Sequence, residues 1–369
     1  MNLKRKILPA VLILTLLLGC MAMTGCQNKE KEEAPPTDQA RTITDMAGRK
    51  VTVPSVINKV YATSPVGSTL MYTVNDKKMI GLNYDLYEEE KEYTTDYYQN
   101  LPNLGGWFGQ GKTGNVEEII KIKPDVVLSS GLNQMAIENA DALSKQLGIP
   151  VVLFDDGFNS LPATYKFIGD LTGDSKQTDK LSAYCKETIA SAKKITDTIK
   201  PENKTRIYYA EETEGLNTDP AGSSHAQLIE ICGGVNVAQV EMQQGYGRSA
   251  VTMEQVLAWN PDFIVACVDN GYAGSDSYNK ILSDPAWSTI NAVKNKEVFQ
   301  TPTIPFNWFD RPPSVNTVIG VKWFQNLLYP DLATYNIKEE AKEFYKLFYH
   351  VDVDDADLDK ILDKGIRTE

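Results

Sequence analysis

The sequence predicts an α/β fold of two Rossmann-like lobes, joined by one long interdomain helix and with a ligand cleft between the lobes. Two observations lead to this prediction. The segments 116–128 and 253–265 align with each other without a gap, and a segment of helical periodicity, 174–200, lies between them. Because a helix that leads into a buried strand is a building unit of α/β sheets, its duplication predicts one sheet in each lobe.

Each copy of the repeat predicts a short helix followed by a strand. Apolar residues at helical spacing are followed by Pro124-Asp125 in the first copy and Pro261-Asp262 in the second, where a helix cannot continue. A run of β-branched and apolar residues then predicts a buried strand. Further strands of this kind are expected at 59–63, 79–82 and 151–154 in the first lobe and at 206–210 and 297–300 in the second.

The segment between the two copies predicts the connecting helix. Its apolar residues recur at approximately helical spacing, Asp174 or Ser175 can cap its start, and Pro201 ends it. The predicted domains are an N-terminal lobe at 42–173, the helix at 174–200 and a C-terminal lobe at 201–369. The alternative is a helix that packs on one lobe only, which has the same periodicity.

The first residues predict export. A cluster of three basic residues at 4–6 precedes an apolar run at 7–18, and small residues precede two cysteines, which indicates a signal peptide at 1–25. We expect Cys26 to be the lipid anchor, with Cys20 as the alternative. The apolar run is short for a bilayer, which argues against an uncleaved transmembrane anchor.

The segment 26–41 predicts a disordered tether because it is charged, contains proline and has no aromatic residue. We therefore expect an extracytoplasmic protein, anchored to the membrane by an N-terminal lipid at the outer face of the cell membrane or in the periplasm. The formal net charge is −12, and loss of the three basic residues of the signal peptide makes it −15. This surplus of acids argues against nucleic acid as a partner.

The sequence contains no motif that predicts an enzyme. Gly-x-Ser-x-Gly and His-Glu-x-x-His are missing, and two histidines cannot build a zinc site of three imidazoles. The remote alternative is an exported carboxylate-dependent hydrolase that uses Asp155-Asp156 or Glu211-Glu212. The segment 106–113 matches the phosphate-loop pattern, but it neither follows a buried strand nor runs directly into a helix, so we do not expect it to bind nucleotide.

Four segments carry a family resemblance: 44–54, 115–128, 222–236 and 252–265. Through them the chain resembles the periplasmic solute-binding proteins of the iron-siderophore, haem and cobalamin ABC transporters, the class III or rigid-helix type. The resemblance covers nearly all of residues 42–350. It implies two lobes joined by a single rigid helix, a ligand held in the cleft between them, and little closure on binding.

The resemblance also implies a function. The protein is expected to deliver a ferric-siderophore-type metal chelate to the permease of an ABC importer, which works with a cytoplasmic ATPase. Cobalamin or another corrinoid, haem and a nickel chelate are the alternative ligands. No intrinsic cofactor is implied, since an iron(III) chelate, haem or corrinoid would be the cargo, and we expect a monomer.

Candidate ligand-binding residues follow the predicted strands, because ligands of α/β folds gather where loops leave the carboxyl ends of strands. They combine aromatic rings, two guanidinium groups and one imidazole: Tyr84, Trp107, His225, Tyr246, Arg248, Trp308 and Arg311.

Several of these residues have two interpretations. Trp107 matches an aromatic residue of the cobalamin site in the resembling family, whereas its other role is a surface plug over the core. Arg248 and Arg311 suit carboxylates and phenolates, although Arg311 can instead pair with Asp310. His225 is a candidate metal ligand, to iron in an incompletely wrapped chelate or in haem, or a cap for the helix that follows.

Two acids of the repeat have a separate role in the resembling family. In its cobalamin-binding member, each repeated helix presents a glutamate to arginines of the permease, and the matching positions here are Glu117 and Glu254. The resemblance therefore implies that both dock on the permease. The alternative is that each carboxylate stabilises its own helix, because acids near a helix start interact favourably with the helix dipole.

Overall fold

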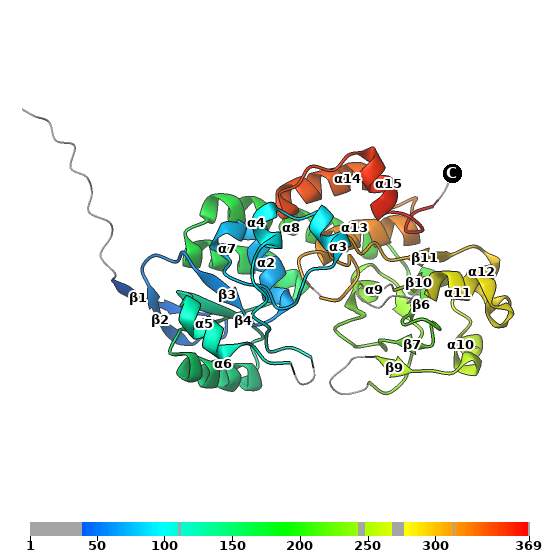
Figure 1. The fold of residues 1–369 in the computed structure, drawn as a ribbon. Coiled ribbons are helices and arrows are strands. Elements are labelled where there is room, and N and C mark those ends of the chain that lie inside the picture. Colours follow the sequence, from blue (N-terminus) through cyan, green and yellow to red (C-terminus); the bar gives the residue numbers. More distant parts are fainter. Residues whose placement is uncertain (1–38, 110–111, 243–247, 268–276, 313, 368–369) are drawn as a thin grey trace, which may run out of the picture. The chain divides into compact units, whose positions relative to one another are not determined.

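The computed structural model describes residues 39–109, 112–242, 248–267, 277–312 and 314–367 (Figure 1). The predicted signal peptide, both candidate lipid-anchor cysteines, nearly all of the predicted tether and Tyr246 lie outside these residues. Within the described part, no helix is both long and apolar enough to cross a membrane.

The first parallel sheet has the strand order β3-β4-β5, and its strands β3 and β4 are labelled in Figure 1. Its strands are β3 (Val60–Ala62), β4 (Val126–Ser130) and β5 (Val151–Phe154), with Val60 opposite Val126 and Val127 opposite Val151. All apolar residues of these strands are buried, because a parallel sheet is covered on both faces. The helices of this region are α2 (Pro65–Asn75), α3 (Glu88–Glu92), α4 (Asp96–Gln99), α5 (Val116–Ile122), α6 (Gln134–Leu147) and α7 (Leu161–Thr172).

The second parallel sheet has the order β11-β10-β6-β8. Its strands are β6 (Arg206–Ala210), β8 (Val235–Asn236), β10 (Phe263–Ala266) and β11 (Val298–Gln300), and β10 pairs with both β6 and β11. The sheet is again parallel throughout. Its helices are α9 (Gln227–Ile231), α10 (Met253–Trp259), α11 (Ser277–Ser283), α12 (Asn291–Lys294) and α13 (Thr317–Leu328).

Two small antiparallel pairs accompany the parallel sheets. The first is β1 (Ala40–Thr44) with β2 (Lys50–Pro54), and the second is β7 (Asn217–Thr218) with β9 (Ser249–Ala250). An isolated bridge between Glu211 and Asn217 continues the second pair toward the end of β6. This pair therefore brings the chain near residue 248 to the carboxyl end of β6.

The helix α8 (Ser175–Thr196) connects the regions of the two parallel sheets. It packs against α7 on one side and α13 on the other, and Gln325 Nε2 of α13 donates a hydrogen bond of 3.1 Å to the carbonyl of Ala192. The predicted connecting helix is thus present, and it contacts elements of both lobes rather than one.

The C-terminal segment contains α14 (Ile337–Phe344), a π-helical turn η5 (Tyr345–Tyr349) and α15 (Asp355–Ile361). The turn packs on α2, and the hydroxyl of Tyr72 donates a 2.5 Å hydrogen bond to the carbonyl of Tyr349. His350 Nε2 lies 3.0 Å from the carbonyl of Tyr72. Although the sequence assigns this segment to the C-terminal lobe, it contacts the first region as well.

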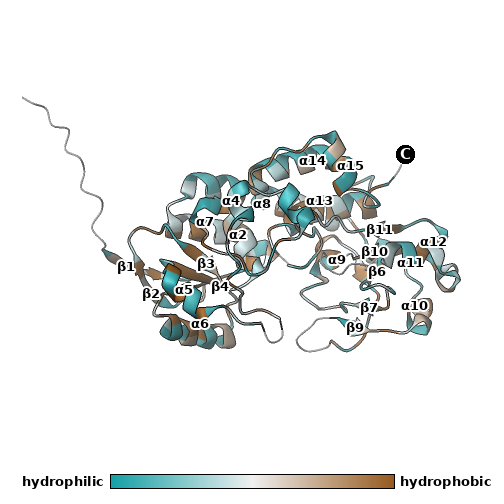
Figure 2. Ribbon diagram, viewed as in Figure 1, coloured by the Kyte–Doolittle hydropathy of each residue, from teal (hydrophilic) through white to brown (hydrophobic). Residues whose placement is uncertain are grey.

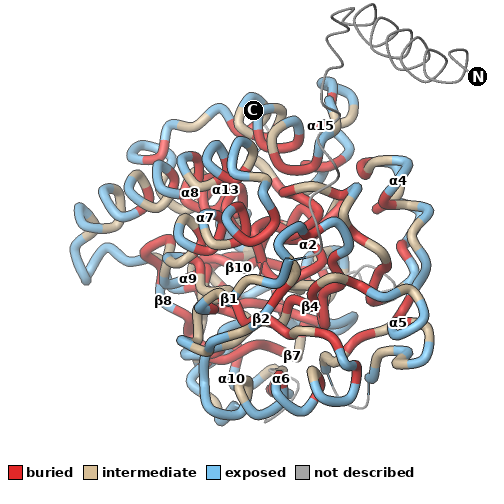
Figure 3. Tube along the Cα trace, turned by 90° about the vertical axis from the view of Figure 1, so that its left-hand side faces the viewer, coloured by how far each residue is buried: buried red, intermediate tan, exposed pale blue. Residues whose placement is uncertain are grey.

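The strands are the most buried parts of the chain, as Figure 3 shows for β4 and β10. The helices carry an apolar and a polar face, which Figure 2 draws as a mixture of brown and teal. One hydrophobic core contains residues from both parallel sheets, for example Leu128 of β4 and Val265 of β10, both fully buried. Two smaller cores lie beside it, one in each region.

Most predicted elements are present, and two predictions need correction. Residues 79–82 form no strand: they make isolated bridges, Val60 with Met79 and Leu82 with Asn103. The predicted tether ends earlier than residue 41, because Arg41 belongs to β1 and its Nη2 donates a 2.6 Å hydrogen bond to the carbonyl of Leu171.

Candidate ligand-binding site

Six ionisable side chains converge beside the carboxyl end of β6, and we call them the charge cluster. They come from segments far apart in the sequence: Glu211, Asp219, His225, Arg248, Asp310 and Arg311. The three carboxylate side chains are fully buried, whereas the side chains of His225, Arg248 and Arg311 are 28%, 17% and 23% exposed. The bases are therefore the members that remain open to a ligand.

Glu211 connects the two arginines. It directly follows β6, and one carboxylate oxygen, Oε1, accepts hydrogen bonds from Nε of Arg248 at 2.9 Å and from Nε of Arg311 at 3.2 Å. The second oxygen, Oε2, is buried and has no hydrogen-bond partner among the described residues. Both guanidinium groups are thus oriented by one atom.

Arg311 is held from three sides. In addition to Glu211, its Nη2 donates a 2.6 Å hydrogen bond to Asp219 Oδ2, and its Nε lies 3.3 Å from Asp310 Oδ2. Its backbone has a φ of 46°, in the left-handed region, which costs free energy for a residue with a Cβ and persists only where surrounding contacts fix it. The local pair with Asp310 is present, and it is one part of a larger network.

His225 lies against Asp310 rather than at a helix end. Its Nδ1 is 2.7 Å from Oδ1 and 3.0 Å from Oδ2 of Asp310, and Ser223 Oγ accepts from its backbone N–H at 3.2 Å. The helix α9 that follows has Ala226 at its N-cap and no side-chain cap, so His225 does not cap it. Among the described residues, His225 Nε2 has no hydrogen-bond partner.

Burial and charge shift three pKa values in the cluster. Burial lowers the pKa of Arg311, but the charges of Asp310 and Glu211 more than offset this and raise it above its ordinary value. Burial raises the pKa of Glu211 to about 8, although Arg311 and Arg248 favour its charged form. Burial lowers the pKa of His225, but the hydrogen bond and the charge of Asp310 more than offset this, so its pKa is above the ordinary value. With a pKa of about 8, Glu211 is mostly protonated at neutral pH, so the three acids do not carry three negative charges there.

The first region contributes a surface pocket of about 460 Å³. Tyr84 lines it, and its hydroxyl donates a 3.0 Å hydrogen bond to Oε1 of the buried Glu90. Burial raises the pKa of Glu90 to about 7. The other lining residues come from the loops around it: Asn83, Asp85, Tyr87, Asn103, Gly105, Gly106, Phe108, Lys112 and Thr113.

Trp107 lies beside this pocket without lining it, whereas its neighbours Gly106 and Phe108 do line it. Its ring covers Gly114, where an added Cβ would lie 2.6 Å from the ring, and it meets Tyr61 edge-on at 6.5 Å. The ring is partly buried against the core. These contacts fit the role of a plug, and ligand stacking by Trp107 stays a prediction.

Trp308 is placed differently from the prediction. Its side chain is fully buried and packs edge-on against Tyr345 at 6.4 Å. A ring without exposed surface cannot stack on a ligand, so we remove Trp308 from the candidate site. The apolar sequence around it, Phe306 to Phe309, is a core segment rather than a ligand-binding loop.

The loop that carries Arg311 is in contact with the start of α2 in the first region. Ser314 Oγ, three residues after Arg311, donates a 3.0 Å hydrogen bond to the carbonyl of Val66, which lies in the first turn of α2. This hydrogen bond links that loop to the helix that follows β3.

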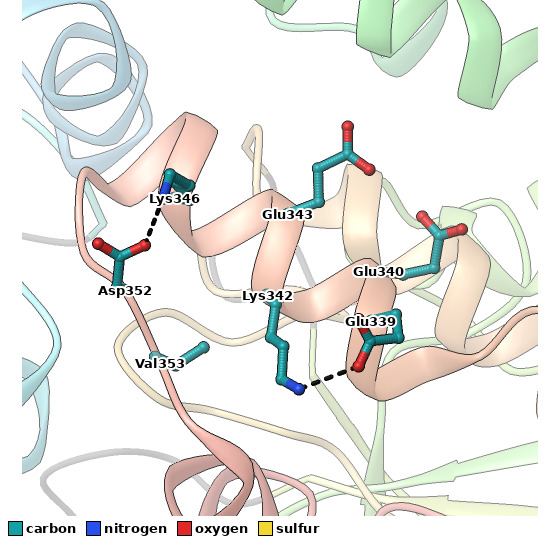
Figure 4. A pocket seen from close by; sticks show the side chains of 7 residues that line it. All are labelled: Glu339, Glu340, Lys342, Glu343, Lys346, Asp352 and Val353. Carbon is teal, nitrogen blue, oxygen red and sulfur yellow. Dashed lines mark hydrogen bonds and ion pairs between the residues drawn. The ribbon is translucent and has the colours of Figure 1, made fainter.

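A second surface pocket, of about 500 Å³, lies along α14 and holds none of the predicted residues (Figure 4). Its lysines are paired with acids: Lys346 with Asp352 at 2.8 Å, and Lys342 with Glu339 at 2.9 Å. Since the ion pairs are exposed, the pocket offers a solvated surface.

The sequence predicts the pairing of Arg311 with Asp310, but it does not predict Glu211 and Asp219 as partners of the arginines. Glu211 directly follows a strand in which every residue except Arg206 is buried, and this position next to a buried run is the one signal in the sequence. No comparable signal marks Asp219. Its role depends on the approach of Arg311, which is 92 residues away.

The fold matches that of the two-lobe periplasmic binding proteins. The family model named "Periplasmic binding protein" matches residues 89–305, more than half of the chain, so the chain belongs to this family. It is therefore a substrate-binding protein of an ABC transporter, and its relatives are solute-binding proteins rather than enzymes.

Three relatives show how far the similarity extends. The molybdate-binding protein MolA of Haemophilus influenzae is 26% identical over 84% of this chain and 91% of its own. An uncharacterized ABC transporter substrate-binding lipoprotein of Bacillus subtilis, YvrC, is 24% identical over 86% of this chain and 96% of its own. The structure is similar to that of an ABC transporter solute-binding protein from Sulfurospirillum deleyianum, with a TM-score of 0.80, 27% identity and coverage of 87% and 98% of the two chains.

Proposed function

We propose that this protein binds a ferric-siderophore-type metal chelate between its two lobes and delivers it to an ABC importer. The observation that carries the proposal is the arrangement of His225: Asp310 binds its Nδ1, and Nε2 has no partner among the described residues. Arg311 directly follows Asp310 and, with Arg248, is partly exposed. An imidazole and two guanidinium groups therefore lie within one cluster.

These groups fit the parts of an anionic metal chelate. A carboxylate on Nδ1 fixes the imidazole orientation and the tautomer, so that Nε2 offers its lone pair, the usual arrangement for a metal-binding histidine. Guanidinium groups bind carboxylates and phenolates through paired hydrogen bonds. His225 would complete the coordination of an incompletely wrapped iron, and the arginines would hold the chelator.

Molybdate, which the MolA relative is named for, is the competing ligand. A tetrahedral oxyanion accepts hydrogen bonds from the arginines and has no use for an imidazole lone pair. Corrinoids, haem and nickel chelates remain further alternatives, for which Tyr84 and its pocket offer an aromatic surface.

The experiment titrates the purified protein with two ferric complexes and with molybdate, and follows tryptophan fluorescence and visible absorption. One chelator is a tetradentate bis-catecholate, which leaves two iron positions open, and the other is a hexadentate tris-catecholate, which leaves none. We expect His225→Ala to weaken binding of the first complex about ten-fold and to shift its charge-transfer band, with little effect on the second. Ser224→Ala, an exposed neighbour, is the matched control.

Unchanged affinity and spectrum in His225→Ala would remove the metal-ligand role. Binding of molybdate without binding of either ferric complex would show that the cargo is molybdate and not a ferric chelate.

Delivery requires docking on the permease, and we assign this role to Glu117 on α5 and Glu254 on α10. Both side chains are exposed. The pKa of Glu254 is lowered, first by a backbone hydrogen bond at its own position and then by Thr252, so it is charged at neutral pH. The double variant Glu117→Lys/Glu254→Lys should abolish uptake of the bound cargo while its affinity for that cargo is unchanged, and unaltered uptake would exclude the role.

Membrane attachment through Cys26, with Cys20 as the alternative, completes the proposal. The name of the YvrC relative, a lipoprotein, supports it. Metabolic labelling with radioactive palmitate should be lost in Cys26→Ser and kept in Cys20→Ser. The opposite pattern would move the anchor to Cys20. Gel filtration of the unlipidated body should give a monomer.

A further inference from the structure

The two repeat helices have matching local structures. In α5 the side chain of Asn115 accepts from the backbone N–H of Glu118, and in α10 the side chain of Thr252 accepts from that of Gln255. Both helices end in a left-handed residue, Lys123 with a φ of 54° and Asn260 with a φ of 41°. The repeat thus includes the caps as well as the apolar pattern.

The strands after these helices also occupy equivalent places. Each is an inner strand of its parallel sheet, β4 between β3 and β5, and β10 between β11 and β6. The backbone N–H of Asp125 donates to the carbonyl of Lys59, and that of Asp262 donates to the carbonyl of Arg206, in both cases at the start of the neighbouring strand. Each helix is therefore fixed on its sheet in the same way.

This equivalence continues on the outer surface, where each helix exposes a large apolar residue. Ile119 and Val256 are fully buried, but the next residues, Ile120 and Leu257, are each 39% exposed. Burial of the first apolar residue accounts for the attachment of each helix. The hydrophobic cores formed by the described residues do not include the second apolar residue of either helix.

An acid lies one turn before each exposed apolar residue. Glu117 and Ile120 are three positions apart, as are Glu254 and Leu257, so each pair shares one face of its helix. An acidic group beside an apolar one is the composition of a protein interface with a charged rim and a desolvated centre. A surface that occurs twice in one chain fits a partner that itself presents two equivalent surfaces.

We propose that Ile120 and Leu257 are the apolar anchors of two equivalent docking surfaces, each of which inserts beside its glutamate into one half of a permease with two like subunits. The inference rests on the proposed docking of Glu117 and Glu254 and adds the desolvated contact. The acids set orientation and the rate of encounter through charge, and the apolar residues contribute the contact that keeps the complex together. Each half of the permease must then offer basic side chains around an apolar socket.

The test places a photo-crosslinking residue, p-benzoylphenylalanine, at Lys121 or at Ala258, which are equivalent exposed positions directly after the proposed anchors. Crosslinking is carried out with the full chain in intact cells, and the product is identified by mass spectrometry. The yield is compared in three backgrounds: unmodified, Ile120→Ser/Leu257→Ser, and Glu117→Gln/Glu254→Gln. The matched control is Met135→Ser/Leu332→Ser, which changes two apolar residues that are 70% and 49% exposed on other surfaces.

We expect both positions to crosslink to the same permease. The yield should fall about ten-fold in each of the two helix double variants and stay unchanged in the control. Loss only in the glutamate variant would leave docking intact and overturn the apolar anchors. Absence of any permease crosslink in the unmodified protein would overturn docking through these helices altogether, and a crosslink to a second copy of this chain would identify a self-association surface instead.

Discussion

At the scale of single residues, Glu211 orients both arginines of the charge cluster, and Asp310 orients His225. His225, Arg248 and Arg311 can be chosen from the sequence because they are polar residues on loops that follow predicted strands. Except for Asp310 beside Arg311, their partners cannot be chosen, because the bonds join residues separated by 37 to 100 positions. The sequence therefore predicts one local ion pair, whereas the structure shows all three bases oriented by buried acids.

Glu211 makes stability depend on pH. Its pKa is about 8 in the folded protein and near its ordinary value of 4.5 in the unfolded chain, so between these values the folded form holds a proton that the unfolded form releases. The contribution of Glu211 to the free energy of unfolding should therefore be fully present below pH 4.5. It should decrease as pH rises toward 8, by an amount on the order of a few kcal/mol.

Glu211→Gln replaces the titratable carboxyl group by an amide and should therefore flatten the dependence of the free energy of unfolding on pH. Urea denaturation at pH 5, 6.5 and 8 should show the variant gaining stability relative to the natural protein as pH rises. Glu212→Gln, a neighbour whose side chain is 50% exposed, is the control and should follow the natural protein. Parallel curves for Glu211→Gln and the natural protein would contradict the prediction.

At the scale of elements, strands bounded by proline or by a charged residue were predicted well. Residues 151–154 and 206–210 are strands with the predicted bounds. A run of apolar residues that begins directly after a proline or at a charged residue leaves little choice for where the strand starts. The failure at 79–82 has a local cause. The Ile80 N–H donates to the carbonyl of Val60, whereas the Leu82 N–H donates to the carbonyl of Pro102, so the pairing changes partner within four residues and leaves only isolated bridges.

The β1–β2 hairpin contains the segment 44–54 that carries part of the family resemblance, but its structural role is not apparent from the sequence. Asp45 in its turn is 4% exposed and accepts hydrogen bonds from the backbone N–H of Arg49 at 2.9 Å and of Leu153, in β5, at 3.1 Å. Arg49 Nη2 in turn donates to the carbonyl of Val151 at 2.6 Å. The hairpin therefore covers the free edge of β5, which protects it from pairing with another chain.

Asp45→Ala should be costly, because it leaves the guanidinium of Arg49, which is 13% exposed, without its buried partner. We expect the free energy of unfolding to fall by about 3–5 kcal/mol, as measured by urea denaturation. Asp141→Ala removes the other acid that pairs with Arg49, but Asp141 is 66% exposed, so the loss should be about 0–1 kcal/mol. Equal losses in the two variants would show that burial of the pair is unimportant.

At the scale of the whole molecule, the regions of the two parallel sheets share more contacts than the sequence predicts. The sequence suggests two lobes and one helix, with a boundary near residue 200. In the structure α8 contacts α7 and α13, and the C-terminal segment returns to α2. This return could not be predicted, because it depends on the packing of Tyr72 and Tyr349, which are 277 residues apart.

These contacts predict that residues 40–369 unfold in a single transition, since one hydrophobic core contains residues of both parallel sheets and of the C-terminal segment. Tyr349 is fully buried and meets Phe306 and Phe344 at 5.3 and 5.1 Å, so Tyr349→Ala should lower the free energy of unfolding by about 3–5 kcal/mol. Its effect should reach both sheets, so that hydrogen exchange rises in β4 and β10 together, whereas Leu332→Ala, at a 49% exposed position, should change neither. Two resolved calorimetric transitions in the natural protein, or faster exchange in β10 alone, would mean that the C-terminal segment belongs energetically to one lobe and that the lobes are joined by α8 only.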